Sequence, residues 1–316
     1  MKRHVRELSV AAAIALLWLV VALRAPSYFS RGNLTDLAMA NVAVLLVALG
    51  MTLVILAGQI DISVGSVFAI ASVCAGVLAK AGVPMPLTIA ATILVGLALG
   101  ALNGALTAYA RIPSIVVTLA TLVALRDGLR WATQGAWVDN LPRNFQWYGL
   151  SLGDSDAIGM AVTLGVLACT AWSLRYLAAG RAVYATGSNP SAAVLAGIDP
   201  ARVTFSVFTI LGALTGLAAL LNSVRFNQIP SNAGLGMEMQ VIAAVVVGGA
   251  SITGGRGTVA GTVLGVVLLG SISPALTFLG LSASWEQAIQ GAIILATVGM
   301  TALGRLQHAH ATPQHG

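Results

Sequence analysis

The sequence predicts an all-α fold, a polytopic transmembrane helical bundle that forms a single domain over residues 1–316. Hydrophobic residues make up 58% of the chain, and the mean hydropathy is +0.91. Only 8% of the residues are charged, whereas roughly 25% are charged in an average soluble domain, so this chain could not cover a water-facing surface. The apolar residues form long continuous runs rather than the alternating segments of a β-barrel.

The apolar runs predict about ten membrane spans, because a helix needs about 20 apolar residues to cross a bilayer. The first run follows a basic N-terminus, as in a secretory signal, but no convincing cleavage site follows it, so an uncleaved helix is expected. The third and eighth runs are short for a full crossing. The predicted spans are residues 8–23, 37–57, 64–80, 87–109, 114–132, 157–177, 204–223, 239–253, 258–279 and 285–303.

Lysine and arginine residues predict the orientation, because they favour the cytoplasmic side of a membrane. Slightly more of them fall on the side of the N-terminus, and Lys2, Arg3 and Arg6 cluster directly before the first span. We therefore expect both termini to be cytoplasmic. Residues 304–316 hold most of the histidines and are predicted to form a flexible tail rather than a metal site.

Two long polar interruptions fall on opposite sides in this topology. Residues 134–156 are expected to face outward, and they carry Trp137, Trp147 and Tyr148. These aromatic side chains fit either an interfacial belt or a docking surface for a partner outside the cell. Residues 178–203 are expected to face inward.

The inward segment contains the signals of a short, capped helix. Ser188 or Asn189 can cap its N-terminus, and Pro190 suits the first helical position. Gly197 can terminate the helix, and Pro200 prevents its continuation. A rigid helix outside the membrane can fit a groove on a partner, although it could instead rest on its own bundle. The residues expected to serve partner contact are Arg181, Tyr184, Asn189, Pro190, Ala193, Leu195, Gly197 and Ile198.

Glycine residues recur at every fourth position in several spans, which predicts helices whose backbones approach closely. These rows are Gly96, Gly100 and Gly104; Gly257, Gly261 and Gly265; and the pair Gly212 and Gly216.

Two loosely similar stretches each interrupt a Val-rich run with Gly, Ser or Thr and a charge. They are residues 57–71, the first break, and residues 248–262, the second break. Paired interruptions of this kind mark a central pathway in transporters, but two cytoplasmic turns would give the same pattern. Asp61 is expected either to cap the first break with Ser63 and Ser66 or to pair with Arg256 in the second.

The chain lacks the motifs that would let it power transport by itself. Its lysines, Lys2 and Lys80, lie outside any G-x-x-x-x-G-K-[ST] loop, and no H-E-x-x-H zinc motif occurs. Clustered basic residues for a nucleic-acid surface are also absent. Ion-driven carriers usually place ionisable groups inside the bundle, whereas the carboxylates of this chain fall near span ends. Energy for transport is therefore expected from another subunit.

Five stretches, in this order along the chain, carry a family resemblance: MTLVILAGQIDISVGSVFAIAS (51–72), IPSIVVTLATL (112–122), GAWVDNLP (135–142), residues 180–203, which end in ATGSNPSAAVLAGIDPARV, and GMEMQVIAAVVVGGASITGGRGTVAGTVLG (236–265). They resemble the bacterial ABC sugar importer permeases of the ribose type, and the match looks closest to those for autoinducer-2 or rhamnose. The resemblance covers most of residues 35–300.

This resemblance implies an assembly in the lipid of the bacterial inner membrane. It would contain two permeases, identical or different, with ABC ATPase subunits and a periplasmic solute-binding protein. Residues 178–203 would be the coupling segment that docks on the ATPase. ATP and Mg²⁺ would bind the ATPase, so this chain would hold no cofactor, no metal and no catalytic residue. The family usually has a second Gly where Gln59 stands, which puts the local pathway width in question.

Alternating access is the expected mechanism, with residues 190–197 moving as a rigid lever. A sugar needs replaceable hydrogen bonds rather than strong charges, so short polar side chains are the pathway candidates, although each also fits helix packing. They are Asn41, Gln59, Asp61, Ser63, Asn103, Thr118, Thr121 and Asn222. The alternative function is an ion- or proton-coupled secondary transporter. A membrane-embedded enzyme is disfavoured, because no nucleophile, base and metal set is clustered in the sequence.

Overall fold

The computed structural model describes residues 2–282, 285, 288–289, 291–292 and 295, and these residues form an all-helical chain, as predicted. Most of the predicted last span, 285–303, and the predicted tail, 304–316, lie outside the described residues. The elements are α1 (Lys2–Arg24), η1 (Pro26–Phe29), α2 (Arg31–Leu56), α3 (Val64–Lys80), α4 (Met85–Ala108), α5 (Ser114–Thr133), η2 (Gln146–Gly149), α6 (Leu152–Tyr176), α7 (Ala178–Ser188), α8 (Pro190–Leu195), α9 (Pro200–Ser223), α10 (Met237–Val247) and α11 (Val259–Phe278).

Within the described chain, six helices are long and apolar enough to cross a membrane, namely α1, α2, α4, α6, α9 and α11. The apolar helices α3 and α10 are shorter. α10 ends at Val247 rather than at residue 253 as expected, because Gly249 takes a φ of +100° and turns the chain. α5 is more polar, since it carries Arg126, Asp127 and Arg130. The total of ten spans and the cytoplasmic termini stay predictions.

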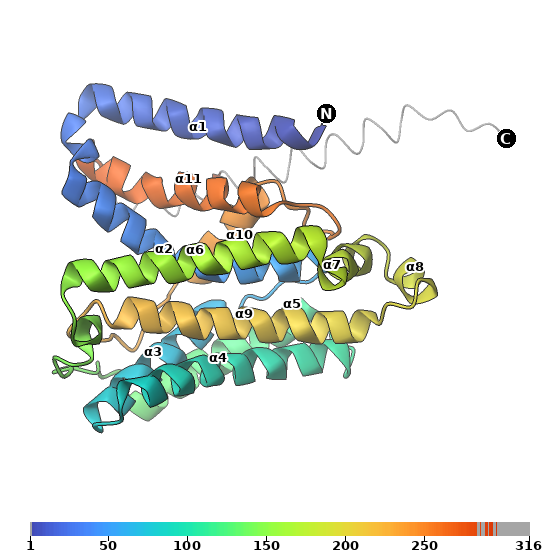
Figure 1. Cartoon of the computed structure of the whole chain (residues 1–316), viewed down its shortest axis with the longest axis horizontal. Helices are drawn as coiled ribbons and strands as arrows, with labels where there is room; N and C mark the ends of the chain where they lie inside the picture. Colours follow the sequence, from blue (N-terminus) through green and yellow to red (C-terminus); the bar gives the residue numbers. More distant parts are fainter. Residues whose placement is uncertain (1, 283–284, 286–287, 290, 293–294, 296–316) are drawn as a thin grey trace.

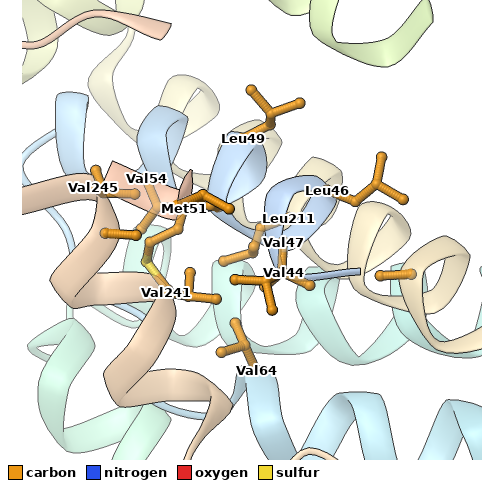
Figure 2. Packing of buried hydrophobic residues seen from close by; sticks show 14 of the residues in the cluster. Val44, Leu46, Val47, Leu49, Met51, Val54, Val64, Leu211, Val241 and Val245 are labelled. Carbon is orange, nitrogen blue, oxygen red and sulfur yellow. The ribbon is translucent and has the colours of Figure 1, made fainter. Parts of the chain in front are cut away.

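α2 is the central helix of the bundle, and it packs against α6, α9, α10 and α11. From Val42 to Leu56 its side chains are buried on almost every face, and Leu46 and Met51 have no exposed surface. Figure 2 shows Met51 near Val241 of α10, and Leu211 of α9 and Val64 of α3 belong to the same buried cluster. Because lipid tails are as apolar as leucine, close packing rather than exclusion of water holds these helices together.

α4 and α9 cross at direct backbone contact, as their glycine rows predict. A methyl group on Gly100 would lie 2.8 Å from the Cα atom of Gly212, and one on Gly96 would lie 2.9 Å from the Cα atom of Gly216. Real Cβ atoms do not approach other atoms this closely. Neither helix can therefore carry a larger residue at these positions without separating from the other.

The bundle has two distinct ends. The N-terminus, α7 and α8 lie at one of them, which we name the coupling end (Figure 1). The loop between α5 and α6, residues 134–151, lies at the opposite end, which we name the distal end (Figure 1). This arrangement agrees with the expected placement of the two polar interruptions on opposite sides. The inward segment holds two helices rather than one, because α7 precedes the expected capped helix.

Candidate functional site

α8 forms at the coupling end as its sequence signals predict. The side-chain oxygen of Asn189, not of Ser188, caps the helix by accepting a 3.0 Å hydrogen bond from the amide of Ala192. Pro190 occupies the first turn, and Gly197 follows the helix with a φ of +78°. The amide of Ile198 donates back to the carbonyl oxygen of Ala193 at 3.0 Å, which closes the C-terminal turn.

α8 projects beyond the ends of the long helices (Figure 1). Leu195 is 91% exposed and Val194 is 59% exposed, whereas Ala193 is buried against the rest of the chain. α8 therefore presents an apolar tip to its surroundings instead of laying that tip on its own bundle. Arg181 of α7 is also exposed, and its guanidinium donates to the carbonyl oxygen of Tyr176 at 3.2 Å. Exposed apolar side chains on a rigid helix are suited to a groove on another protein.

The residues directly before α8 contact both breaks through glycine. Gly58 of the first break, Gly187 of α7 and Gly254 and Gly255 of the second break form what we name the glycine junction. A methyl group on Gly254 would lie 2.7 Å from the carbonyl oxygen of Gly187 and 2.8 Å from the Cα atom of Gly58. The amide of Gly255 also donates to the carbonyl oxygen of Leu56 at 2.9 Å, so the second break is bonded to the end of α2.

The first break is stabilised by a small polar cluster at the start of α3. One carboxylate oxygen of buried Asp61 accepts hydrogen bonds from the amide of Ser63 at 2.7 Å and from its hydroxyl at 2.6 Å. The side-chain amide of Asn103, on α4, donates to the Ser63 hydroxyl at 2.8 Å. Of the two expected roles for Asp61, the cap is therefore the one observed, and no ion pair with Arg256 occurs in the described chain. Gln59 lies beside this cluster and is partly buried.

The other predicted pathway residues are not brought together. The side chains of Asn41, Thr118 and Thr121 bond to carbonyl oxygens of their own helices, at 2.8, 2.8 and 3.0 Å respectively. These bonds favour helix packing over solute contact for all three. Asn222 lies apart from them near the distal end of α9, where it lines a cavity.

This distal cavity was not predicted from the sequence, and its volume is about 460 Å³. Its wall depends on the pairing of two loops that are distant in sequence. Val138 and Ile229 exchange backbone hydrogen bonds of 2.9 and 3.0 Å, and the amide of Trp147 donates to the carbonyl oxygen of Val224 at 2.8 Å. Asn222, Asn227 and Gln228 lie close together in the sequence, and these amide side chains were the signal that could have indicated a polar site.

Two residues of opposite charge, Arg126 and Glu238, lie beside the cavity, and their proximity was not predicted from the sequence either. The guanidinium of Arg126 donates to the carbonyl oxygen of Ala233 at 2.8 Å, and its charge is close to Glu238 in the first turn of α10. In the loop at the same end, burial raises the pKa of the Tyr148 hydroxyl to about 12.

Comparison with known proteins gives consistent matches. The family model described as "Branched-chain amino acid transport system / permease component" matches residues 33–298. The chain is 37% identical over 295 residues to the autoinducer 2 import system permease protein LsrC of Escherichia coli (strain K12 / DH10B), which covers 93% of this chain and 86% of the relative. The protein of the same name from Photorhabdus luminescens is 34% identical over 299 residues, with 93% and 88% covered. That from Enterobacter sp. (strain 638) is 36% identical over 306 residues, with 96% and 88% covered. No solved structure matches.

Proposed function

Because this chain belongs to the family of branched-chain amino acid transport system permease components, we propose that it is the membrane subunit of an ABC importer for a sugar or sugar-like solute. Its similarity to permeases named for autoinducer 2 import supports autoinducer-2 or a monosaccharide as the solute. The chain is a multi-pass protein of the bacterial inner membrane, and six helices have the length and apolarity of membrane spans.

The observation that carries this proposal is the exposed apolar tip of α8. Leu195 is 91% exposed on a helix that is capped by Asn189 and lies outside the membrane helices. We propose that this tip is seated in an ATPase subunit, which binds ATP and Mg²⁺. The short capped helix would transmit force as a rigid body, because both of its ends are fixed by hydrogen bonds.

The glycine junction provides a route from α8 to the interior of the bundle. Gly187 lies two residues before the cap Asn189, and it contacts both breaks. A displacement of α8 would therefore move the loop before α3 and the loop before α11 together. We propose that this paired displacement changes access to the pathway between two permease copies, identical or different. A periplasmic binding protein would supply the solute at the distal end.

The test is reconstitution of the purified chain in liposomes, with and without its ATPase subunits, binding protein and ATP. We expect uptake of autoinducer-2 or a neutral monosaccharide only when all components and ATP are present. An ion- or proton-coupled secondary transporter predicts the opposite result. Uphill uptake by this chain, driven by an imposed ion or pH gradient without ATPase, would refute the proposed function.

A further inference from the structure

The distal cavity has the size and shape of a small-molecule site. Its volume of about 460 Å³ falls within the range of about 300–1,000 Å³ that is typical for such sites. α3, the end of α9 and the loop over residues 224–236 form its walls, and Trp137 reaches it from the paired loop. The end of α9, which forms part of its wall, lies at the end of the bundle opposite α8 (Figure 1), where a solute would enter if α8 is cytoplasmic.

Two serine hydroxyls in the cavity wall lack hydrogen-bond partners within the described chain. Ser72 of α3 is 1% exposed, and Ser223 at the end of α9 is 2% exposed. Two buried helical serines outside the cavity do have partners: the hydroxyl of Ser66 donates to the carbonyl oxygen of Ser63 at 2.7 Å, and that of Ser271 donates to the carbonyl oxygen of Val267 at 2.6 Å. Because a buried hydroxyl without a partner is unfavourable, the pair indicates a ligand with hydrogen-bonding groups.

The remaining lining residues restrict the chemistry of that ligand. Asn222, Asn227 and Gln228 supply amide groups, which can both donate and accept hydrogen bonds, as the hydroxyls of a sugar require. The rings of Trp137 and Phe226 are about half exposed and offer flat apolar surfaces to the C–H faces of such a molecule. None of the described residues that line the cavity is charged. The guanidinium of Arg126 beside it already bonds to the carbonyl oxygen of Ala233 and lies close to Glu238, so the wall itself offers an ionised ligand no counter-charge.

We propose that the distal cavity binds the transported solute within the permease, and that it accepts a neutral polyhydroxylated molecule. Ser72 and Ser223 hold its hydroxyl groups, and Trp137 and Phe226 pack on its apolar face. The proposal rests on the proposed function, because it assigns the solute site of an importer. It places that site at the distal end, far from the glycine junction, so that solute binding and force transmission use separate residues.

The first test is uptake by the reconstituted complex with autoinducer-2 and D-ribose as probes and ribose 5-phosphate as the charged contrast. The double variant Ser72→Ala and Ser223→Ala is expected to raise the KM for the neutral probe that is carried by about tenfold, since each substitution removes one hydrogen bond. Copurification of the double variant with its ATPase subunits shows that the complex is intact. Ser271→Ala is the matched control, because it removes an equally buried hydroxyl that already has a partner.

The second test measures binding without transport. In a background with Cys74→Ser and Cys169→Ser, which removes the native thiols, Asn227→Cys introduces a thiol at the cavity. We expect a neutral probe, but not ribose 5-phosphate, to slow its labelling by a membrane-impermeant maleimide. Asn144→Cys, an exposed site in the paired loop, should label at the same rate with and without probe.

The outcomes separate the two proposals. Normal KM in the double serine variant, together with labelling of Asn227→Cys that no neutral probe slows, would overturn the cavity assignment while leaving the importer function intact. Absence of uptake in the complete wild-type complex would refute the importer function, and the labelling test would still decide whether the cavity binds a neutral polyhydroxylated molecule. Protection by ribose 5-phosphate as strong as that by D-ribose would contradict the inferred selectivity for neutral ligands.

Discussion

The hydroxyl of Tyr184 donates a 3.0 Å hydrogen bond to the backbone carbonyl oxygen of Gly257, and this bond joins α7 to the second break. The two residues belong to segments that are far apart in the sequence, and Gly257 directly precedes the cap of α11. The bond therefore lies between the helix that leads into α8 and the start of a long membrane helix. It adds a side-chain link to the backbone contacts of the glycine junction.

Tyr184→Phe removes only this donor and keeps the ring. We expect a loss of about 1 kcal/mol in stability, because one hydrogen bond is deleted. The larger effect should be on coupling, with fewer solute molecules imported per ATP hydrolysed by the reconstituted complex. If the variant imports as much solute per ATP as the wild type, the hydrogen bond between Tyr184 and Gly257 does not contribute to coupling. Thr209→Val, which removes a side-chain bond within α9 at a site away from the junction, is the control.

Gly254→Ala should disrupt the glycine junction. Gly254 has a φ of +82°, and its Cβ atom would lie 2.8 Å from the backbone of Gly58. Left-handed strain and overpacking together should destabilise the protein by about 2–5 kcal/mol. Gly82→Ala separates the two causes, because Gly82 has a φ of +75° with open space around it and should lose only about 1–2 kcal/mol. Thermal unfolding of both variants in detergent measures the difference, and equal losses would contradict the packing explanation.

Gly100→Ala should separate α4 from α9. Its methyl group would overlap the backbone of Gly212, whereas an alanine at Gly128 on α5 would meet nothing within 4 Å. We expect a loss of about 1–3 kcal/mol for Gly100→Ala and a neutral or slightly stabilising effect for Gly128→Ala, since alanine is the better helix former. A melting temperature of Gly100→Ala at or above that of Gly128→Ala would show that this crossing is not tightly packed.

Leu195→Glu tests the tip of α8. Because Leu195 is 91% exposed, the substitution should leave folding and insertion unchanged. We expect the variant to lose copurification with the ATPase subunit, since a charge would be buried without a partner at the docking surface. Leu195→Met keeps an apolar side chain of similar volume and should retain most of the binding. Full assembly and uptake with Leu195→Glu would remove α8 from the proposed interface.

Features that depend on nearby residues could be predicted from the sequence. The bounds of α8 follow from Asn189, Pro190 and Gly197, which act within one short segment. The cap of the first break likewise needs only Asp61 and its neighbour Ser63. These signals concern hydrogen bonds that form regardless of the rest of the fold.

Features that depend on tertiary packing could not be predicted. The glycine junction brings Gly58 next to Gly187, and no local pattern specifies that contact. The distal cavity requires Val138 to pair with Ile229, which only the completed bundle makes possible. The pathway candidates on α2 and α5 were chosen by polarity, but their side chains can bond to their own helical carbonyls, so polarity did not identify a site.

The crossing of α4 and α9 restricts where this protein can change shape. Gly96, Gly100, Gly212 and Gly216 place main chain directly against main chain, so at these positions no side chain can switch rotamers to absorb sliding. We therefore expect these two helices to move as one rigid body during the transport cycle. The relative movements that open and close the pathway are expected at other helix–helix interfaces, where longer side chains can change their contacts.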